Sequence, residues 1–370
     1  MPIAPLMTPM PQPVTAVVAV EPVYSVLMSM VALRDPENYG GLDEWVLQTV
    51  SQMASALREQ HRMLFEWLWL DGLTNAVPRG SATESFPAYL AALAEQPALA
   101  LRDKLFYWLL HSPHMRVGYE YRTPPPPDPN ALLANYDTFA AYIEERAGAK
   151  VDEVGNVPQM YALFNQPEQL QTTIVTHLQT LWEEHLAAEW VRVQPKLQAT
   201  VDAFQHVRLE GLSMLEAMQV VTGRDVRPAF RLDALLAYRR VRFIPHIHNG
   251  PYIIWFGDNE ELRIGFAAHQ PPQMVNAGVA FDLGTLTNRY NALADETRLA
   301  MLLALRTAHE LSTQELIDHF GLDKSAASRH LRQLVATSLL EERRVDGAKK
   351  VYRINKKAVD ELLEFLTDLA

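Results

Sequence analysis

The chain of 370 residues contains no cysteine. Disulfide bonds, thiolate metal ligands and cysteine nucleophiles are therefore excluded by composition, and such a chain suits a reducing compartment. No Lys or Arg precedes Arg34, so the proline-rich start lacks the positive flank of a secretory signal. The apolar stretch from Val14 to Leu33 is interrupted by Glu21 and Pro22, which leaves no run long enough for a membrane span. We expect a cytoplasmic protein with no membrane partner.

Three signatures of enzymes are also missing. The chain has no glycine-rich phosphate loop, no G-x-S-x-G nucleophile elbow and no H-E-x-x-H metal motif. Neighbouring acids such as Glu144-Glu145 and Glu183-Glu184 are typical of solvated helix faces. We therefore expect no enzymatic activity, no catalytic residue and no cofactor. The alternative is an enzyme or ligand-binding scaffold that uses its C-terminal module only to dimerise, and a cofactor motif in the larger part would distinguish it.

The composition indicates a folded protein of two or three domains. Hydrophobic residues make up 48% of the chain and charged residues 21%, as in ordinary globular proteins. The formal net charge of -11 argues against a protein that coats nucleic acid indiscriminately. Between Asp323 and Lys357, however, ten Lys and Arg outnumber four Asp and Glu. An acidic protein thus carries one basic segment.

Residues 1–280 predict a helical domain that contains a small sheet. Apolar residues recur at three- and four-residue spacing, which predicts four helical segments: Trp45 to Leu70, Phe86 to Leu110, Ala131 to Arg146 and Pro167 to Trp190. The proline run from Pro124 to Pro129 predicts a stiff loop between helices of one domain. Dense aromatic residues in these segments favour a packed core, while an aromatic-lined effector pocket stays open as an alternative.

At residues 241–268 the pattern changes to short β-prone runs. They are separated by the turn residues Asn249-Gly250 and Gly257-Asp258-Asn259, which predicts a small antiparallel sheet. The run from Val14 to Val20 could supply another strand. After a break at Pro271 to Gln273 we place the domain boundary near residue 280. The fold class is therefore mainly α with small β elements, an α+β protein.

Residues 281–370 predict a winged helix-turn-helix. Asp295 is placed to cap a helix that ends near Ala308, with Leu299, Leu302 and Leu303 facing inward. The S-x-x-E capping box from Ser312 to Glu315 opens a second helix, with Leu316, Ile317 and Phe320 on its core side. Gly321 ends it in a left-handed conformation, and Asp323 caps a third helix after only two residues. Two helices joined so tightly are typical of a helix-turn-helix.

The third helix, at about 324–336, is the predicted reading helix. Ala327, Leu331 and Leu334 recur at core spacing, so the opposite side should point outward from the protein. Small hydroxyl and arginine side chains suit a major groove, because slim residues let the helix approach and arginine bonds guanine edges or phosphates. The predicted DNA contacts on this helix are Lys324, Ser325, Ser328, Arg329, His330 and Arg332. Solvated arginines, and a packed His330, are the alternatives.

A basic hairpin follows at about 343–350. Leu339 to Arg344 and Lys350 to Ile354 are strand-like and flank the turn residues Asp346-Gly347. The predicted contacts with the DNA backbone in this wing are Arg343, Arg344, Lys349 and Lys350. The last segment carries an apolar stripe that predicts a partner helix and a homodimer with two reading heads, formed by Val359, Leu362, Leu363, Leu366 and Leu369.

This C-terminal module resembles the ArsR/SmtB family of bacterial winged-helix regulators. The resemblance covers about a quarter of the chain and rests on LADETR at 293–298, LSTQEL at 311–316, GLDKSAASRHLRQL at 321–334 and VYRIN at 351–355. It implies dimeric binding to double-stranded DNA, usually repressive, that a signal releases. Ser338 departs from the family, which commonly has glycine before the wing.

The larger part is similar to the helical domain of a group of long ArsR-like regulators. The segments that carry this weaker similarity are VEPVYSVLMSMVALRDPENY from residue 20 and LWEEHLAAEWVRVQPKL at 181–197. It implies a sensor or interaction role without naming a ligand, and a small-molecule effector is one of the partners that we consider. Metal sensing is the family's best-known signal mode. His246, His248 and His269 lie close in sequence, and His246 and His248 should share a strand face, but such pairs are usually surface or hydrogen-bonded residues, so we expect no metal.

Overall fold

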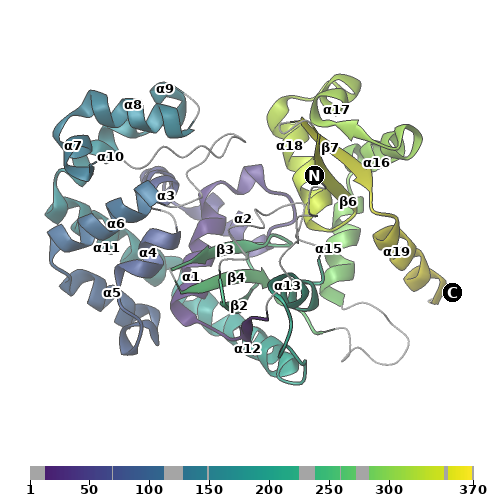
Figure 1. The fold of residues 1–370 in the computed structure, drawn as a ribbon, viewed down its shortest axis with the longest axis horizontal. Helices are drawn as coiled ribbons and strands as arrows, with labels where there is room; N and C mark the ends of the chain where they lie inside the picture. The colour runs from purple at the N-terminus through teal and green to yellow at the C-terminus, as the bar shows by residue number, and fades with distance from the viewer. Residues whose placement is uncertain are drawn as a thin grey trace, which may run out of the picture.

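The computed structural model describes residues 13–68, 70–111, 128–147, 150–224, 238–258, 260–271, 283–345 and 349–368. Within them the chain is mainly helical with two small sheets (Figure 1), as the sequence predicts. Among these residues, no helix combines the length and the hydrophobicity needed to cross a membrane. The prolines at 124–127, the break after Pro271 and the boundary near residue 280 lie outside the described residues.

The first part of the chain packs helices around one large apolar core. These helices are α1 (Pro22–Arg34), α2 (Glu44–Gln52), α3 (Ser55–Trp67), α4 (Leu70–Ala76), α5 (Phe86–Glu95), α6 (Ala98–His111), α7 (Pro129–Ala134), α8 (Tyr136–Ala147), α9 (Val151–Val154), α10 (Val157–Phe164), α11 (Pro167–Leu181), α12 (Ala187–Phe204) and α13 (Met214–Thr222). Short helical turns are η1 (Pro36–Asn38), η2 (Ser81–Thr83) and the π-turn η3 (Trp182–Leu186).

Three of the four long helical segments predicted from the sequence are in fact pairs of helices. The segment from residue 86 divides at Gln96, which is extended because it precedes Pro97. The segment from residue 45 divides at extended Met53, and the one from residue 131 at Asn135. The fourth continues beyond its predicted end, through η3, to Phe204.

The central sheet has the strand order β1-β2-β4-β3, formed by β1 (Thr15–Val18), β2 (Arg240–His246), β3 (Ile254–Gly257) and β4 (Glu261–Ala267). The predicted strand at Val14 to Val20 is thus present as β1. The prediction of an antiparallel sheet is right for β3 and β4 only, because β2 runs parallel to both β1 and β4. Residues 247–253 do not close a hairpin between β2 and β3. They carry the chain past the position of β4 to the edge of the sheet, so that β4 pairs with β2 on one side and with β3 on the other.

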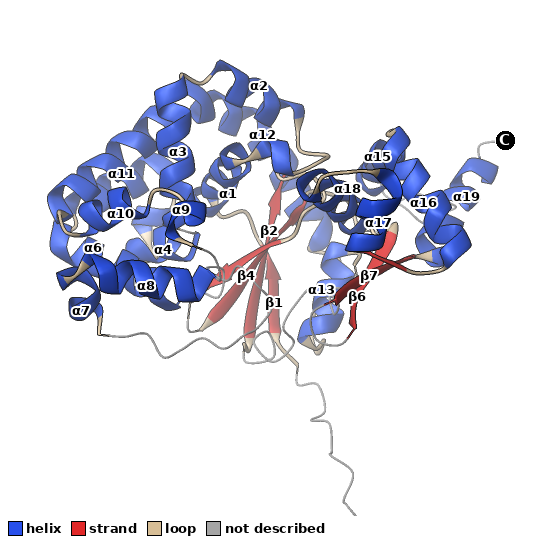
Figure 2. Cartoon of the chain, turned by 90° about the horizontal axis from the view of Figure 1, so that it is seen from above, coloured by secondary structure: helices blue, strands red, loops and turns tan. Residues whose placement is uncertain are grey.

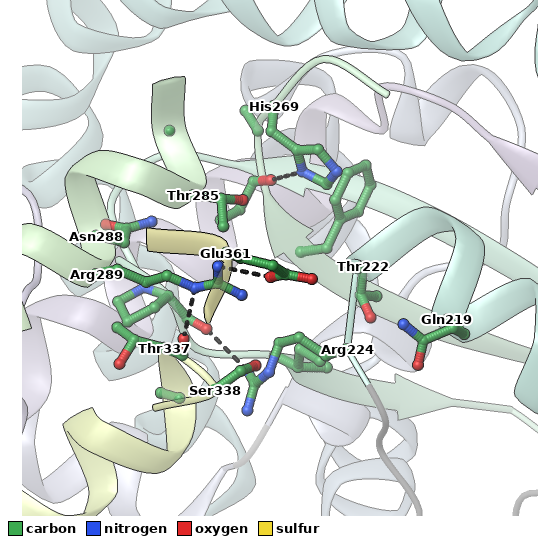
Figure 3. A pocket seen from close by; sticks show the side chains of 18 of the residues that line it. Gln219, Thr222, Arg224, His269, Thr285, Asn288, Arg289, Thr337, Ser338 and Glu361 are labelled. Atoms are coloured by element: carbon green, nitrogen blue, oxygen red, sulfur yellow. Dashed lines mark hydrogen bonds and ion pairs between the residues drawn. The ribbon is translucent and has the colours of Figure 1, made fainter. Parts of the chain in front are cut away.

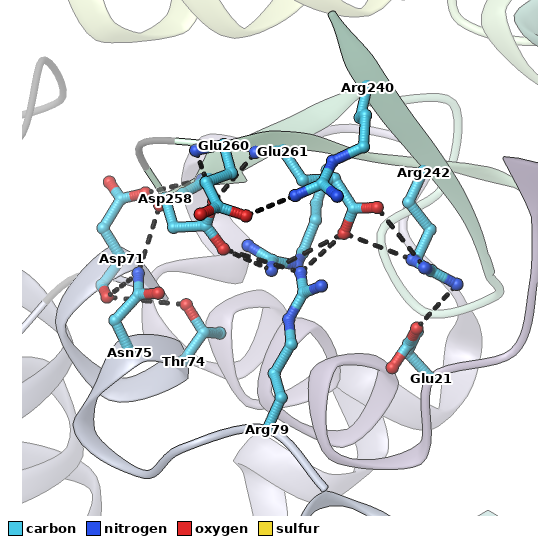
Figure 4. A network of polar contacts seen from close by, with 12 residues as sticks. Glu21, Asp71, Thr74, Asn75, Arg79, Arg240, Arg242, Asp258, Glu260 and Glu261 are labelled. Atoms are coloured by element: carbon cyan, nitrogen blue, oxygen red, sulfur yellow. Dashed lines mark hydrogen bonds and ion pairs between the residues drawn. The ribbon is translucent and has the colours of Figure 1, made fainter. Parts of the chain in front are cut away.

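Both faces of this sheet are covered (Figure 2). Ile244 and Phe256 join the core of α1 and its neighbouring helices, while Val241 and Phe243 join a second core with α13. A network of charged side chains connects the first residues of β2 and β4 to the neighbouring helical part (Figure 4). Within it, the Arg263 side chain is 1% exposed and lies 2.8 Å from Asp258, and the Asp71 carboxylate accepts the Gly257 amide proton at 3.0 Å.

The C-terminal part has its own apolar core. Its elements are α15 (Leu283–Leu293), α16 (Glu296–Ala308), β5 (Leu311–Ser312), α17 (Thr313–Phe320), α18 (Lys324–Ala336), β6 (Leu340–Val345), β7 (Lys349–Ile354) and α19 (Lys356–Asp368). The strands form an antiparallel sheet of order β5-β7-β6. This order of helices followed by a hairpin is that of a winged helix-turn-helix, as predicted, and the tip of the hairpin lies outside the described residues.

One core prediction in this module is wrong. Leu299 and Leu303 are 45% and 54% exposed, and the buried side of α16 is formed by Met301 and Leu305. The spacing of apolar residues cannot distinguish the two sides of this helix, because both carry leucine. The apolar stripe of α19 is also divided, since Leu362 is buried whereas Leu363 and Leu366 are 56% and 49% exposed.

Candidate nucleic-acid interface

The local geometry of the helix-turn-helix follows from its capping residues. The Ser312 and Glu315 side chains form the predicted capping box at the start of α17. Gly321 ends α17 with φ +62, a left-handed conformation, and the Asp323 carboxylate accepts the Ala326 amide proton at the start of α18. With Ala327 and Leu331 buried beneath α18, the opposite side of the helix is fixed as a polar face.

We define this polar face as the reading face of α18. It consists of Lys324, Ser325, Ser328, Arg329 and Arg332. Lys324, Ser325 and Arg332 are exposed, and Ser328 and Arg329 are half-buried. The Arg332 guanidinium donates to the Ser328 hydroxyl at 3.3 Å, so the two arginines and two serines form one continuous polar surface.

The expectation that the reading face points away from the rest of the chain is wrong. Residues 37–41, which begin within η1 and continue past its end, lie against it, and α18 faces the larger part of the molecule (Figure 2). Arg329 donates to the Glu37 carbonyl at 3.2 Å, and Arg332 donates to the Asn38 carbonyl at 2.7 Å. The Arg332 guanidinium also lies over the Tyr39 ring, 4.7 Å from its centroid.

His330 differs from the rest of the predicted set. It is 8% exposed, and its ring lies 3.6 Å from the Asp295 carboxylate that caps α16. Burial lowers the pKa of His330, although the nearby carboxylate partly opposes the shift. The structure therefore places His330 as a packed residue between two helices and not on the reading face.

The basic residues of the wing are distributed over both strands. Arg344 in β6 is paired with Lys350 in β7, one residue from the undescribed tip. Arg343 and Lys350 form ion pairs with the acids Glu310 and Glu342, at 2.5 Å and 2.8 Å. Lys349 is exposed and lies 3.8 Å from Glu315, at the start of α17. The wing thus places cations beside the helix-turn-helix, although intramolecular acids compete for them.

Ser338 adopts a left-handed conformation, which glycine adopts more easily than serine. Its φ is +62, and the amides of Ser338 and Leu339 bond back to the carbonyls of Val335 and Leu334. This is the Schellman motif that ends helices at a left-handed residue. The turn into the wing is therefore intact, with a serine held at a strained φ.

The three histidines considered for metal binding do not converge. His246 is buried at the end of β2 with its Nε2 bonded to the Tyr252 carbonyl, and His269 follows β4. His248 lies beyond β2, so the two histidines do not share a strand face as expected. His248 instead contacts Glu189 at 2.6 Å, near Asp43. The Arg192 guanidinium bonds both oxygens of Glu189, so an arginine already neutralises the carboxylate that a metal would need.

A cavity of about 370 Å³ lies where the larger part meets the C-terminal module (Figure 3). Its walls come from α13, the end of β4, α15, α19 and the turn after α18. Arg224 and Arg289 line it together with Lys357 and the acid Glu361. Arg289 donates to Glu361 at 2.9 Å, whereas Arg224 donates to the carbonyls of Pro251 and Val335. Burial lowers the pKa of Arg224 to about 10, so it keeps its charge at neutral pH.

Sequence reasoning found the residues of the reading face and the wing but missed Glu37, Asn38 and Tyr39. These residues contribute backbone carbonyls and one ring from nearly 300 residues away, so no local pattern marks them. The available signal was that PENY at 36–39 ends one of the two segments on which the expected similarity to long regulators rests.

Comparison with known proteins agrees with this geometry. A family model described as a helix-turn-helix domain matches residues 293–343. The arsenical resistance operon repressor of Staphylococcus aureus is 32% identical over 74 residues, which are 20% of this chain and 69% of that protein. The matched region contains α16, α17, α18 and the start of the wing. The chain therefore belongs to the ArsR family of DNA-binding winged helix-turn-helix transcriptional regulators.

Proposed function

We propose that the chain is a homodimeric repressor in which residues 281–370 bind DNA and dimerise, and residues 1–280 receive a signal. In this proposal α18 enters the major groove through its reading face, and Arg329 and Arg332 bond base edges or phosphates. The wing cations contact the backbone and fix the register without reading sequence. The observation that carries the proposal is the polar reading face of α18, opposite a side that is fully buried.

The proposed dimer uses α19. Leu363 and Leu366 are large apolar side chains that are about half exposed on the last helix of the chain. A second copy of α19 would cover them in a two-fold arrangement and would hold two reading heads about one helical turn of DNA apart. Repression follows if such a dimer occupies a promoter, as the name of the staphylococcal relative indicates for that protein.

The proposed effector is a small anion that binds in the cavity of Figure 3. Arg224, Arg289 and Lys357 outnumber the single acid Glu361 among the charged residues that line it. Because the walls belong to both parts of the chain, a ligand there would stabilise their present arrangement. Titration with inorganic phosphate and short dicarboxylates, followed by the affinity for DNA, tests this assignment. Arg224→Gln should abolish any effect that the anion has.

A binding assay with the full-length protein tests the function as a whole. The protein should bind duplexes from the promoter region of its own gene more tightly than random duplexes of equal length. The affinity should fall steeply with salt, because cations on the protein displace ions from the phosphates. Equal affinity for both kinds of duplex would contradict the proposal.

A further inference from the structure

The reading face of α18 is the surface that the proposed function needs, and residues 37–41 occupy it. Arg329 and Arg332 donate to two successive backbone carbonyls, those of Glu37 and Asn38. A carbonyl oxygen is the same kind of acceptor as guanine O6 or a phosphate oxygen. Residues 37–41 therefore provide the two guanidinium groups with hydrogen-bond acceptors of the kind that DNA offers.

Side chains extend the contact on both sides of these hydrogen bonds. The Tyr39 ring stacks beneath the Arg332 guanidinium, and the Asn38 amide oxygen lies 3.5 Å from the Ser325 hydroxyl. Gln333, which is 3% exposed, packs against Gly40. A Cβ atom at Gly40 would lie 1.9 Å from the Gln333 amide oxygen and 2.7 Å from its Cδ, so a larger residue here would force the buried end of the Gln333 side chain to move.

The segment is anchored to the larger part of the chain. The Tyr252 hydroxyl donates to the Gly40 carbonyl at 2.9 Å, and the Tyr252 ring meets the Tyr39 ring edge to face. The Asp43 amide donates to the carbonyl of His248, whose ring is held by the buried Glu189. Near the C-terminal end of α18, Arg224 donates to the carbonyls of Pro251 and Val335 and so links this helix to the larger part. Residues 37–41 are thus a fixed part of the larger domain's surface.

A duplex and this segment cannot occupy the reading face together. The major groove must receive the side of α18 that now contacts Glu37, Asn38 and Tyr39, and each guanidinium group would have to exchange its acceptors. We propose that residues 37–41 are an autoinhibitory element, so that the chain binds DNA only after α18 has separated from them. This inference rests on the proposed DNA-reading role of α18 and adds the regulation of that surface.

The hydrogen bonds that Arg329 and Arg332 donate to residues 37–41 lie at the exposed surface, where water and DNA compete for them. Such an interface gives an equilibrium between closed and open chains, which DNA shifts by binding the open form. The observed association constant for DNA is then the intrinsic constant of the open chain multiplied by the fraction of chains that are open. A ligand that stabilises the closed arrangement releases DNA by the same linkage.

A disulfide lock tests the proposal in the full chain. Because the chain has no cysteine, the double variant Asn38→Cys/Ser325→Cys introduces one thiol pair, at side chains whose oxygens are 3.5 Å apart. Oxidation should form the disulfide and reduce the affinity for promoter DNA toward the non-specific level, roughly 1,000-fold or more. Because Ser325 itself lies on the reading face, the never-oxidised double variant is the reference, and reduction of the oxidised sample should return the affinity to that reference. Prior addition of promoter DNA should slow formation of the disulfide.

A steric variant provides the opposite test. Gly40→Ala should displace the Gln333 side chain from its buried place against residues 37–41, weaken the closed arrangement and increase the affinity for promoter DNA roughly tenfold, since the open fraction rises. Gln333→Ala removes the clashing atoms and leaves the Gln333 Cβ as the nearest of the three contacts, at 3.5 Å. The double variant Gly40→Ala/Gln333→Ala should therefore return to the affinity of Gln333→Ala alone, which serves as its matched control.

The outcomes separate this proposal from the proposed function. If the reduced cysteine variant and the unmodified chain bind no duplex specifically, the DNA-reading role itself fails. If the reduced form binds promoter DNA and the oxidised, cross-linked form binds equally well, the function stands and the autoinhibition is refuted. Failure of the two thiols to form a disulfide under oxidation would also count against the closed arrangement.

Discussion

The larger part and the winged helix module differ in the charge they present to a polyanion. Residues 281–370 carry thirteen Lys and Arg against fourteen Asp and Glu, whereas residues 1–280 carry twenty against thirty. Nearly all of the net charge of -11 thus belongs to the larger part. In the proposed function the module attracts phosphates through α18 and the wing, while the more acidic part that supplies residues 37–41 repels them. In this proposal the larger part opposes DNA binding in two ways: residues 37–41 cover the reading face, and the negative charge of residues 1–280 repels phosphates.

The largest expected effect is a loss of DNA affinity when the arginines of the reading face are replaced. Arg329→Ala and Arg332→Ala should each weaken specific DNA binding by about 1 to 3 kcal/mol if both arginines touch bases. The measured loss is a net value, because the same substitutions weaken the contact with residues 37–41. Fluorescence anisotropy with promoter DNA measures it. Arg306→Ala, on the exposed surface of α16, is the matched control and should change the affinity little.

A second effect distinguishes the two parts by their stability in acid. His61, His177 and His246 are buried in the larger part, and burial lowers the pKa values of His61 and His246 to about 4 and of His177 to about 3. Both rings are therefore neutral in the folded protein near pH 7, and since the Met30 carbonyl accepts from the His61 Nε2, the His61 Nδ1 must accept from the His177 Nε2. In the unfolded chain these histidines titrate near 6.5. Above that pH they are neutral in both states, and the free energy of unfolding is undiminished. As the pH falls toward 4 only the unfolded chain binds the protons, so the free energy of unfolding decreases.

Tryptophan fluorescence measures this acid sensitivity in the larger part alone, because all seven tryptophans precede residue 281. The free energy of unfolding from that signal should fall between pH 6.5 and 4. Each histidine that stays neutral contributes a fall of up to about 1.4 kcal/mol for every pH unit below its unfolded pKa. His177→Gln should make the fall shallower. A stability that does not change over this range would show that these rings are charged or hydrated in the folded protein.

A third effect concerns the exposed leucines of the module. Leu363→Glu/Leu366→Glu should convert the proposed dimer to a monomer in analytical ultracentrifugation, because charged side chains would replace the apolar contact. The affinity for a two-site duplex should fall roughly tenfold or more when the two heads are no longer linked. Leu99→Glu, at a similarly exposed leucine of α6, should leave the assembly unchanged. A monomeric unmodified chain would refute this use of α19.

The smallest effect tests the turn between α18 and the wing. Ser338 holds φ at +62, where a Cβ atom is unfavourable and glycine is not. Ser338→Gly should therefore stabilise the module by about 1 kcal/mol, which thermal unfolding followed by circular dichroism can detect. Ser213→Gly, which removes a capping box in the larger part, should have the opposite sign.

The features that sequence reasoning predicted correctly are those whose physical cause is local. The Ser312 capping box, Gly321 and the Asp323 cap each act within a few residues, so the helix-turn-helix could be drawn from the sequence. The strand order of the central sheet depends on where β4 inserts, and the exposure of Leu299 depends on which side of α16 meets a neighbour. Both are decided by packing over long distances in the chain, as is the contact between residues 37–41 and α18.

Hydrogen–deuterium exchange of the full-length protein with and without promoter DNA tests the central claim most directly. If DNA takes the place of residues 37–41 on α18, the backbone amides of α18 should stay protected in the complex while those of residues 37–41 exchange faster. Unchanged protection of residues 37–41 in a sample saturated with specifically bound DNA would contradict the account.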